Sequence, residues 1–360
     1  MCIVNKYSYK EYNYNITKMR IEEDTKLDYN DVLIRPKRSM LSSRSQVNLE
    51  RTINFPNSGQ SWTGIPIMCA NMDTIGTYEM YKVFSEYKII TAFHKFYTLE
   101  DYQNMENLNK DFFMVSTGIS DDNLECLKDI LEAIDVKFIC VDIANGYIGN
   151  LVTFCTNLRK LYPDKIIVAG NVVTREITEE LILIGKVDIV KIGIGPGSAC
   201  LTRIKTGVGM PQLSAIAECA DAAHGVNGFI IGDGGITSPG DLSKGYGAGA
   251  DFIMIGGMFS GHDENPGDII EENGKKFKLF YGMSSKTAME KNYGKMAKYR
   301  SSEGRTVKIN YKGPLKNTIE DILGGVRSTC TYINAKNIKN IPKCCTFVKV
   351  NRIINNIYTK

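Results

Sequence analysis

Residues 228–235 read GFIIGDGG, and residues 250–257 read ADFIMIGG. Each stretch is a short apolar run that ends in a pair of glycines. Apolar runs without alternation are typical of strands that are buried on both faces, as in parallel sheets. The two stretches therefore predict two strands of a parallel sheet, each followed by a tight turn.

Six further runs of this kind precede the pair. They read PIMCANMD (66–73), IITAFHK (89–95), FFMVSTG (112–118), KFICVDIANG (137–146), KIIVAGNVVT (165–174) and VDIVKIGIG (187–195). Helical patterns lie between the runs, and three of these begin at Thr98, Ser120 and Pro211, residue types that favour helix starts. Eight strand–helix units predict an α/β fold, a single (β/α)8 TIM barrel. An open doubly wound sheet is the alternative, but no GxGxxG follows the first strand.

Two strand-to-helix connections are too long for simple turns. The first runs from Gly193 to about Met210, and the second covers roughly residues 258–313. Long loops in compact domains are usually functional, and on a barrel both would rise from the C-terminal face, where active sites lie. The second contains DIIEENGKKFKLFYG (268–282), whose Asn273-Gly274 pair predicts a hairpin that forms a flap over the barrel mouth.

The domain prediction follows from these patterns. We expect one barrel over residues 19–360, with the flap insertion at about 258–313 and no second domain. The first 18 residues are rich in Asn, Tyr and Lys, and we expect them to form a poorly ordered arm.

Charge and cysteine usage exclude several classes of protein. The 360 residues include 44 basic and 40 acidic ones, and the net charge of +4 is too weak to indicate a nucleic-acid-binding protein. The ten cysteines are dispersed without a CxxC pair, which indicates a reduced, intracellular protein, cytoplasmic and without structural zinc. No apolar stretch of about 18 residues occurs, so no membrane span is predicted.

Glycines after the last two strands predict a phosphate site. Barrels frequently bind phosphate through backbone N–H groups in these two loops, and glycine lets the backbone approach the oxygens closely. One glycine pair alone would more often make only a tight turn, but two pairs on the expected strands favour phosphate. Asp233 is better suited to accept hydrogen bonds from sugar hydroxyls. The candidate residues are Asp233, Gly234, Gly235, Gly256 and Gly257, with Gly282, Met283 and Ser284 after the hairpin.

A cysteine lies in the first long loop, in GIGPGSACLTR (193–203). Reactive thiolates need exposure and an electropositive setting, which Arg203 and Lys205 would supply to Cys200. Position alone leaves two interpretations of Cys200 open, a nucleophile and a small buried residue. Buried packing is the expectation for Cys69, Cys140, Cys155 and Cys219.

Longer motifs around these residues resemble the IMP dehydrogenase/GMP reductase family, and its GMP reductases in particular. The motifs are KLDYNDVLIRPKRS (26–39), ANMDT (70–74), AGNVVT (169–174), GIGPGSACLTRIKTGVGMPQLSAIAECADAAHG (193–225), IGDGG (231–235), GAGADFIMIGGMFSGHDE (247–264), KLFYGMSS (278–285) and DILGGVRSTCTY (321–332). The resemblance covers roughly residues 19–355. No pair of CBS motifs follows HKFYTLED (94–101), and the pattern TRIKTGVG (202–209) and Glu303 in YRSSEGRTVKI (299–309) are similar to the reductases.

The resemblance implies the reaction of GMP with NADPH to give IMP, ammonia and NADP⁺ in purine nucleotide salvage. It implies that Cys200 adds to carbon 2 of guanine and forms a covalent thioimidate, while Thr202 and Glu303 handle protons. An IMP dehydrogenase without CBS motifs and a catalytically idle purine-nucleotide binder are the alternatives. Leu201 and Ile119 depart from residues that are usual in the family.

The resemblance also implies a set of binding residues and a homotetramer. For GMP they are Asp233, Gly234, Gly235, Gly256, Gly257, Gly282, Met283, Ser284, Arg300, Ser301, Ser302 and Gly304. For NADPH they are Lys95, Asp142, Ile143, Ala144, Asn171, Met283, Tyr299 and Arg300, with Ser43, Arg44, Ser328, Thr329, Cys330 and Thr331 reaching the cofactor of a neighbouring subunit. Gly195, Gly197, Cys200 and Arg203 resemble the family's monovalent-cation loop, with K⁺ as the candidate ion.

Overall fold

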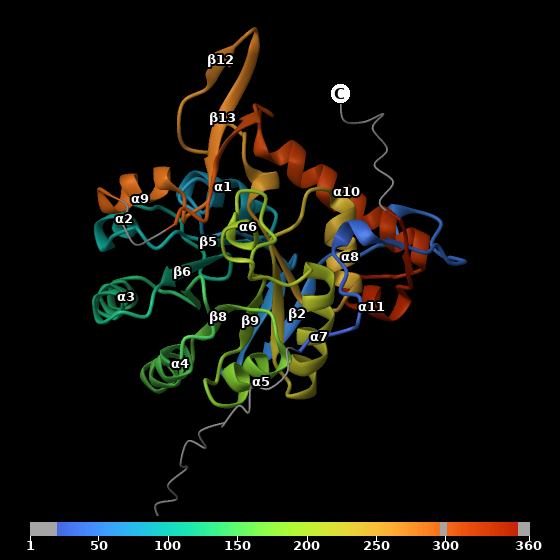
Figure 1. Ribbon diagram of the computed structural model, residues 1–360, viewed down its shortest axis with the longest axis horizontal. Helices are drawn as coiled ribbons and strands as arrows, with labels where there is room; N and C mark the ends of the chain where they lie inside the picture. Colours follow the sequence, from blue (N-terminus) through green and yellow to red (C-terminus); the bar gives the residue numbers. More distant parts are fainter. Residues whose placement is uncertain (1–19, 296–300, 352–360) are drawn as a thin grey trace, which may run out of the picture.

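The computed structural model describes residues 20–295 and 301–351 (Figure 1). The poorly ordered arm that we expected over residues 1–18 lies outside the described residues. Within the described part, no helix has both the length and the apolar character needed to cross a bilayer.

Eight parallel strands close into a barrel in the spatial order β10-β11-β4-β5-β6-β7-β8-β9, and β9 pairs with β10. They are β4 (Ile67–Cys69), β5 (Ile90–Ala92), β6 (Phe113–Thr117), β7 (Phe138–Asp142), β8 (Ile166–Val172), β9 (Ile189–Ile192), β10 (Phe229–Asp233) and β11 (Phe252–Ile255). Each strand lies within one of the eight apolar runs, so the predicted (β/α)8 fold is confirmed.

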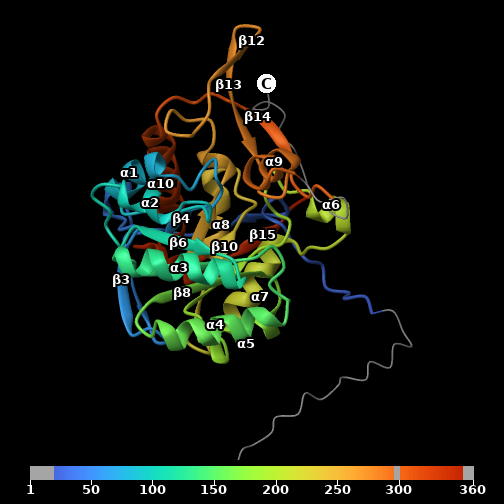
Figure 2. The same ribbon diagram turned by 90° about the vertical axis from the view of Figure 1, so that its left-hand side faces the viewer.

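Helices follow the strands and cover the outside of the barrel, as Figures 1 and 2 show for α3, α4 and α5. They are α1 (Tyr78–Glu86), α2 (Leu99–Gln103), α3 (Asp121–Ala133), α4 (Asn150–Leu161), α5 (Arg175–Leu183), α7 (Gln212–Gly225), α8 (Pro239–Gly247) and α10 (Leu315–Ile333), with the short α6 (Thr202–Thr206) before α7. The hydroxyls of Thr98 and Ser120 accept hydrogen bonds from the first turns of α2 and α3. With Pro211 directly before α7, the three predicted helix starts are confirmed.

A two-stranded hairpin closes one end of the barrel, and it was not predicted from the sequence. It consists of β2 (Arg51–Phe55) and β3 (Gln60–Gly64). Phe55 packs edge-on against Phe138 and Phe229, which are the first residues of β7 and β10. Trp62 belongs to the same inner cluster. The hairpin therefore fills the end where the strands begin, and the site lies at the other end.

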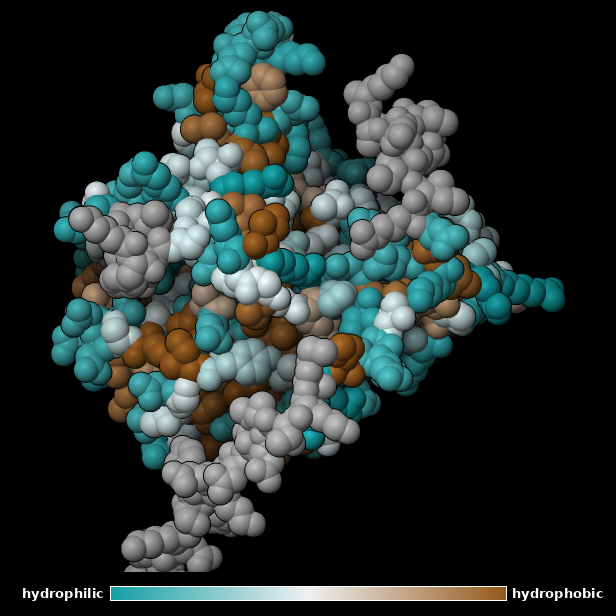
Figure 3. Space-filling model, in the orientation of Figure 1, coloured by the Kyte–Doolittle hydropathy of each residue, from teal (hydrophilic) through white to brown (hydrophobic). Residues whose placement is uncertain are grey.

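The insertion after β11 forms a small sheet that rises over the barrel mouth (Figure 1). Its strands are β12 (Ile270–Glu272), β13 (Lys275–Tyr281) and β14 (Thr306–Asn310), with α9 (Lys286–Tyr293) between β13 and β14. Asn273 and Gly274 have φ angles of 52° and 71°, so the predicted hairpin turn is confirmed. The third strand, β14, was not predicted. Figure 3 shows mostly hydrophilic residues over the tip of the hairpin.

The two ends of the described chain meet at the side of the barrel. There β1 (Val32–Ile34) pairs with β15 (Phe347–Lys349) in antiparallel orientation. The remaining elements are α11 (Ile341–Cys344) and the 3-10 helices η1 (Tyr29–Asp31), η2 (Arg44–Gln46), η3 (Gly257–Phe259) and η4 (Ile338–Asn340).

A buried ion pair links α4 to the start of β9. Arg159 Nη2 lies 2.5 Å from Asp188 Oδ2, and both residues are buried. The carboxylate also accepts hydrogen bonds from the amides of Ser58 (3.0 Å) and Ile167 (2.8 Å). Because Asp188 is buried, loss of the guanidinium would leave a buried charge without its counterion.

We predict that Arg159→Ala lowers the free energy of unfolding by about 3 to 5 kcal/mol. The matched control is Arg175→Ala, since Arg175 forms an exposed pair with Asp221 and its loss should cost at most about 1 kcal/mol. Urea denaturation followed by circular dichroism measures both. Equal midpoints for the two variants would contradict the prediction.

Candidate active site

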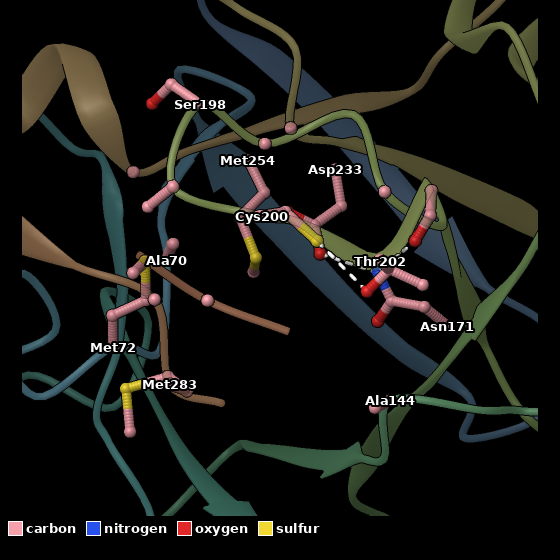
Figure 4. Close-up of a pocket in the computed structure, with 18 of the residues that line it drawn as sticks. Ala70, Met72, Ala144, Asn171, Ser198, Cys200, Thr202, Asp233, Met254 and Met283 are labelled. Carbon is pink, nitrogen blue, oxygen red and sulfur yellow. Dashed lines mark hydrogen bonds between the residues drawn. The ribbon is translucent and has the colours of Figure 1, made fainter. Parts of the chain in front are cut away.

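Most of the predicted site residues meet in one cavity of about 250 Å³ at the ends of the barrel strands (Figure 4). Its walls are the loops after β4, β7, β9, β10 and β11, together with the insertion. The predicted residues that line it are Asp142, Ile143, Ala144, Asn171, Gly195, Gly197, Cys200, Thr202, Asp233, Gly234, Gly235, Gly256, Gly257, Gly282, Met283, Ser284, Glu303 and Gly304.

Other predicted residues lie elsewhere. Tyr299 and Arg300 are outside the described residues, and Ser301 and Ser302 lie just beyond the cavity wall, where the Ser302 hydroxyl donates to the Gly304 carbonyl (2.8 Å). Lys95 follows β5, and its Nζ lies 5.8 Å from the centre of the Phe96 ring.

The residues predicted to reach a neighbouring subunit form a separate group on the flank of the barrel. They are Ser43 and Arg44 at η2, and Ser328, Thr329, Cys330 and Thr331 on α10, which packs against η2. Cys330 is fully buried, so only its neighbours on α10 can face a ligand. The structure brings this group together but not to the cavity.

A series of hydrogen bonds joins the cavity thiol to a carboxylate. The Cys200 thiol donates to Thr202 Oγ1 over 3.2 Å, and the Thr202 hydroxyl donates to Glu303 Oε2 over 2.7 Å (Figure 4 draws the first two residues). All three side chains are half-buried. The arrangement connects the sulfur to a proton acceptor through one hydroxyl group, which is the geometry that general acid–base catalysis needs.

Main-chain hydrogen bonds hold the Cys200 loop against the returning strand of the insertion. The amide of Leu201 donates to the carbonyl of Glu303 (2.6 Å), and the amide of Arg305 donates to the carbonyl of Ala199 (3.0 Å). The Arg305 guanidinium adds two hydrogen bonds to the carbonyl of Ser198. We call this contact between residues 198–201 and 303–305 the loop–flap seam. It fixes the distance between the thiol and the carboxylate.

Asp73, which follows β4, anchors the insertion from below. Its Oδ2 accepts hydrogen bonds from the Tyr281 hydroxyl (3.0 Å), Lys291 Nζ (3.1 Å) and Asn292 Nδ2 (3.3 Å). Its own amide donates to the Met283 sulfur at 3.4 Å. The anchor therefore positions Met283 at the cavity wall.

The glycine loops present backbone amides to the cavity. Gly234 and Gly235 have φ angles of +88° and +80°, which favour glycine. The amides of Gly235, Met283 and Ser284 have no acceptor among the described residues. All three residues line the cavity, and backbone amides without a protein acceptor can bind an anion there.

The four cysteines that were expected to be buried are buried. Burial raises the pKa of the thiols of Cys140 and Cys155 to about 12 and that of Cys219 to about 11, so these thiols stay protonated at neutral pH. Cys200 is set apart from them by its partial exposure and its place in the cavity.

A buried lysine beneath the cavity was not predicted from the sequence. Lys191 on β9 is 1% exposed, and its Nζ lies 2.5 Å from Asp142 Oδ1 and 3.4 Å from Asp233 Oδ2. Burial alone would lower the pKa of Lys191, but the two carboxylates outweigh it and raise that pKa. The signal was present in VDIVKIGIG, as one charged residue within an apolar strand. Met72, Met254 and Phe280 also line the cavity and were not predicted.

Arg203 and Leu201 make contacts that hold the Cys200 loop in place. Arg203 Nη1 donates to Asp28 Oδ2 (3.1 Å), so its guanidinium faces away from the cavity. Leu201 precedes α6 and contributes its amide to the seam. Within the described ranges, no group of three or more His, Cys, Asp or Glu side chains is arranged to hold a metal ion.

The cavity thus combines an accessible thiol, a proton relay, unpaired amides and two carboxylates that share one ammonium group. Such a set can bind a phosphorylated ligand that carries hydroxyl groups, and it can support nucleophilic addition with proton transfer.

Comparison with known proteins agrees with this geometry. The family described as "IMP dehydrogenase / GMP reductase domain" matches residues 26–354. Proteins named GMP reductase from Escherichia coli O139:H28 (strain E24377A / ETEC), O157:H7 and K12 (DH10B) are each 56% identical to the chain over an alignment of 348 residues, and the alignment covers 94% of this chain and 100% of theirs. The chain belongs to the IMP dehydrogenase/GMP reductase family of enzymes.

Proposed function

We propose that the protein catalyses the NADPH-dependent reductive deamination of GMP to IMP, with release of ammonia, in purine salvage. The observation that carries the proposal is the hydrogen-bonded series Cys200–Thr202–Glu303 beside the glycine loops. The name of the relatives, GMP reductase, supports the same reaction. We infer one catalytic barrel with its flap insertion and no CBS motifs.

GMP would bind with its phosphate on the unpaired amides and its base toward Cys200. The amides of Gly235, Met283 and Ser284 suit a phosphate because they donate hydrogen bonds without an internal acceptor. Asp233 would accept hydrogen bonds from the ribose. Its carboxylate already acts as an acceptor in the structure, where Oδ2 accepts a hydrogen bond from Asn171 Nδ2 at 2.8 Å. Arg300, Ser301, Ser302 and Gly304 would complete this site from the flap.

In the first step, a bond forms between Cys200 Sγ and carbon 2 of guanine, and the bond from carbon 2 to the amino nitrogen breaks. The thiol proton passes through the Thr202 hydroxyl to Glu303, along the hydrogen bonds of the relay. Glu303 then returns the proton to the departing amine, which leaves as ammonia. The product is a covalent thioimidate on Cys200.

In the second step, carbon 2 is reduced by two electrons and its bond to sulfur breaks, which releases IMP. Reduced nicotinamide supplies the hydride when it is bound. The Cys200 thiolate then takes up one proton, so the sum is GMP, NADPH and H⁺ giving IMP, ammonia and NADP⁺. Each turnover begins with Cys200 as a free thiol, which fits a reducing compartment such as the cytoplasm.

The residues beside Cys200 fit a nicotinamide nucleotide. Asp142 offers a carboxylate to ribose hydroxyls, and the soft side chains of Met72, Met254 and Met283 suit flat rings (Figure 4). Ile143, Ala144, Asn171, Lys95, Tyr299 and Arg300 would complete this site. Ser43, Arg44, Ser328, Thr329, Cys330 and Thr331 would contact the cofactor of a neighbouring subunit in a homotetramer.

The backbone carbonyl groups of the Cys200 loop also suit a potassium ion. Gly195 and Gly197 line the cavity, and backbone carbonyl oxygens are the groups that replace the hydration shell of K⁺ in proteins. Arg203 would take part through its carbonyl, because its guanidinium faces Asp28.

We predict that Cys200→Ala lowers GMP turnover by about a thousandfold or more, because the addition step loses its nucleophile. The assay follows NADPH absorbance after mixing protein with GMP. NADPH consumption that is no faster in the unaltered protein than in Cys200→Ala would contradict the proposal. Reduction of NAD⁺ with IMP, and no reaction with GMP, would indicate an IMP dehydrogenase, whereas tight GMP binding with neither reaction would indicate an idle binder.

We predict that Glu303→Gln lowers kcat by about 100-fold to 10,000-fold, because the amide cannot accept the relayed proton. Glu271→Gln on the exposed strand β12 is the matched control and should retain full activity. Steady-state kinetics of both variants test the relay. A kcat for Glu303→Gln equal to that of the control would exclude Glu303 as the proton acceptor.

A further inference from the structure

Lys191 joins two carboxylates that come from different strands. Its Nζ contacts Asp142 at the end of β7 and Asp233 at the end of β10, at 2.5 and 3.4 Å. Asn71 Oδ1, after β4, accepts a hydrogen bond from the same ammonium group over 3.4 Å. All three partners line the cavity. Lys191 thus contacts residues from three walls of the cavity.

The burial of this ammonium group is costly unless its surroundings are anionic. Removing a charged group from water is energetically costly, and a close counterion can offset most of that cost. Here the two carboxylates provide the compensation, and Lys191 in turn lowers the pKa of Asp142 against the opposing effect of burial. The three side chains together carry one net negative charge beneath the cavity.

Among the groups around this cluster, Lys191 is the cation that contacts both carboxylates. Asn171 Nδ2, on β8, donates to Asp233 Oδ2 without adding charge. Cys140, on β7, is a buried thiol whose pKa burial raises to about 12, so it is neutral. Lys95, after β5, also lowers the pKa of Asp142, but it makes no hydrogen bond to that carboxylate.

We propose that Lys191 is a positioning residue that holds the carboxylates of Asp142 and Asp233 directed into the cavity, where each accepts hydrogen bonds from the ribose of one bound nucleotide. This inference rests on the proposed function, because it assigns Asp233 to GMP and Asp142 to the nicotinamide nucleotide. Lys191 itself transfers no proton in the reaction.

Removal of the ammonium group should make GMP binding depend on pH. In Lys191→Met, two half-buried carboxylates face each other without a counterion, and the pKa of one of them must rise. The protonated form is a weaker acceptor for ribose hydroxyls. GMP affinity is therefore retained above the raised pKa and falls by up to about tenfold for each pH unit below it.

The test is calorimetric titration of GMP into the full chain between about pH 6 and about pH 8.5, a range in which an ordinary aspartate stays ionised. The ratio of the dissociation constants of Lys191→Met and the unaltered protein removes the titration of GMP itself. We expect this ratio to grow at least about tenfold from the high to the low end of the range.

Two further variants keep the result interpretable. Lys278→Met removes another buried lysine, whose Nζ donates to the carbonyls of Asp263 and Asn265, and its ratio should not change with pH. Lys191→Met combined with Asp142→Asn removes the repulsion, so GMP binding should again become independent of pH even if Lys191→Met alone folds poorly.

A ratio for Lys191→Met that stays constant with pH, or a double variant that keeps the pH dependence, would overturn the inference. Failure of the proposed function looks different, because the unaltered protein would then either not bind GMP at any pH or bind GMP without consuming NADPH.

Discussion

The loop–flap seam is the contact on which the site depends. Main-chain hydrogen bonds from Leu201 to Glu303 and from Arg305 to Ala199 join segments about a hundred residues apart in the chain. Without them Cys200 and Thr202 would belong to one mobile loop and Glu303 to another, and the proton relay would have no fixed length. The seam thus joins two long connections into one wall of the cavity.

The barrel strands, rather than the seam, place the charged groups beneath the cavity. The β2–β3 hairpin fills the end where the strands begin, so the polar groups that the fold must place near the core gather at the opposite end. There Lys191, Asp142 and Asp233 neutralise one another in part, which lets charged side chains lie next to an apolar interior. The Asp73 anchor then holds the insertion over this polar layer.

Much of this architecture could be predicted from the sequence, because the decisive signals are local. The eight apolar runs, the capping hydroxyls of Thr98 and Ser120 and the Asn273-Gly274 turn each act within a few residues. The β2–β3 plug and β14 were missed because their partners are distant and their patterns weak. Lys191 was missed because the carboxylates that explain its burial lie on other strands. Ser43 lies at η2, away from the cavity, so its role at the cofactor of a neighbouring subunit stays a prediction.

The seam has one more consequence, which concerns how such a site can change over time. Apart from the Arg305 guanidinium, it is built from N–H and C=O groups, and every residue except proline provides both. The other side chains along residues 198–201 and 303–305 can therefore be exchanged while these main-chain hydrogen bonds persist, and Leu201 contributes to them through its amide alone. A family with this construction can acquire new chemistry by small steps, since catalytic identity and structural integrity are encoded by different atoms of the same segment.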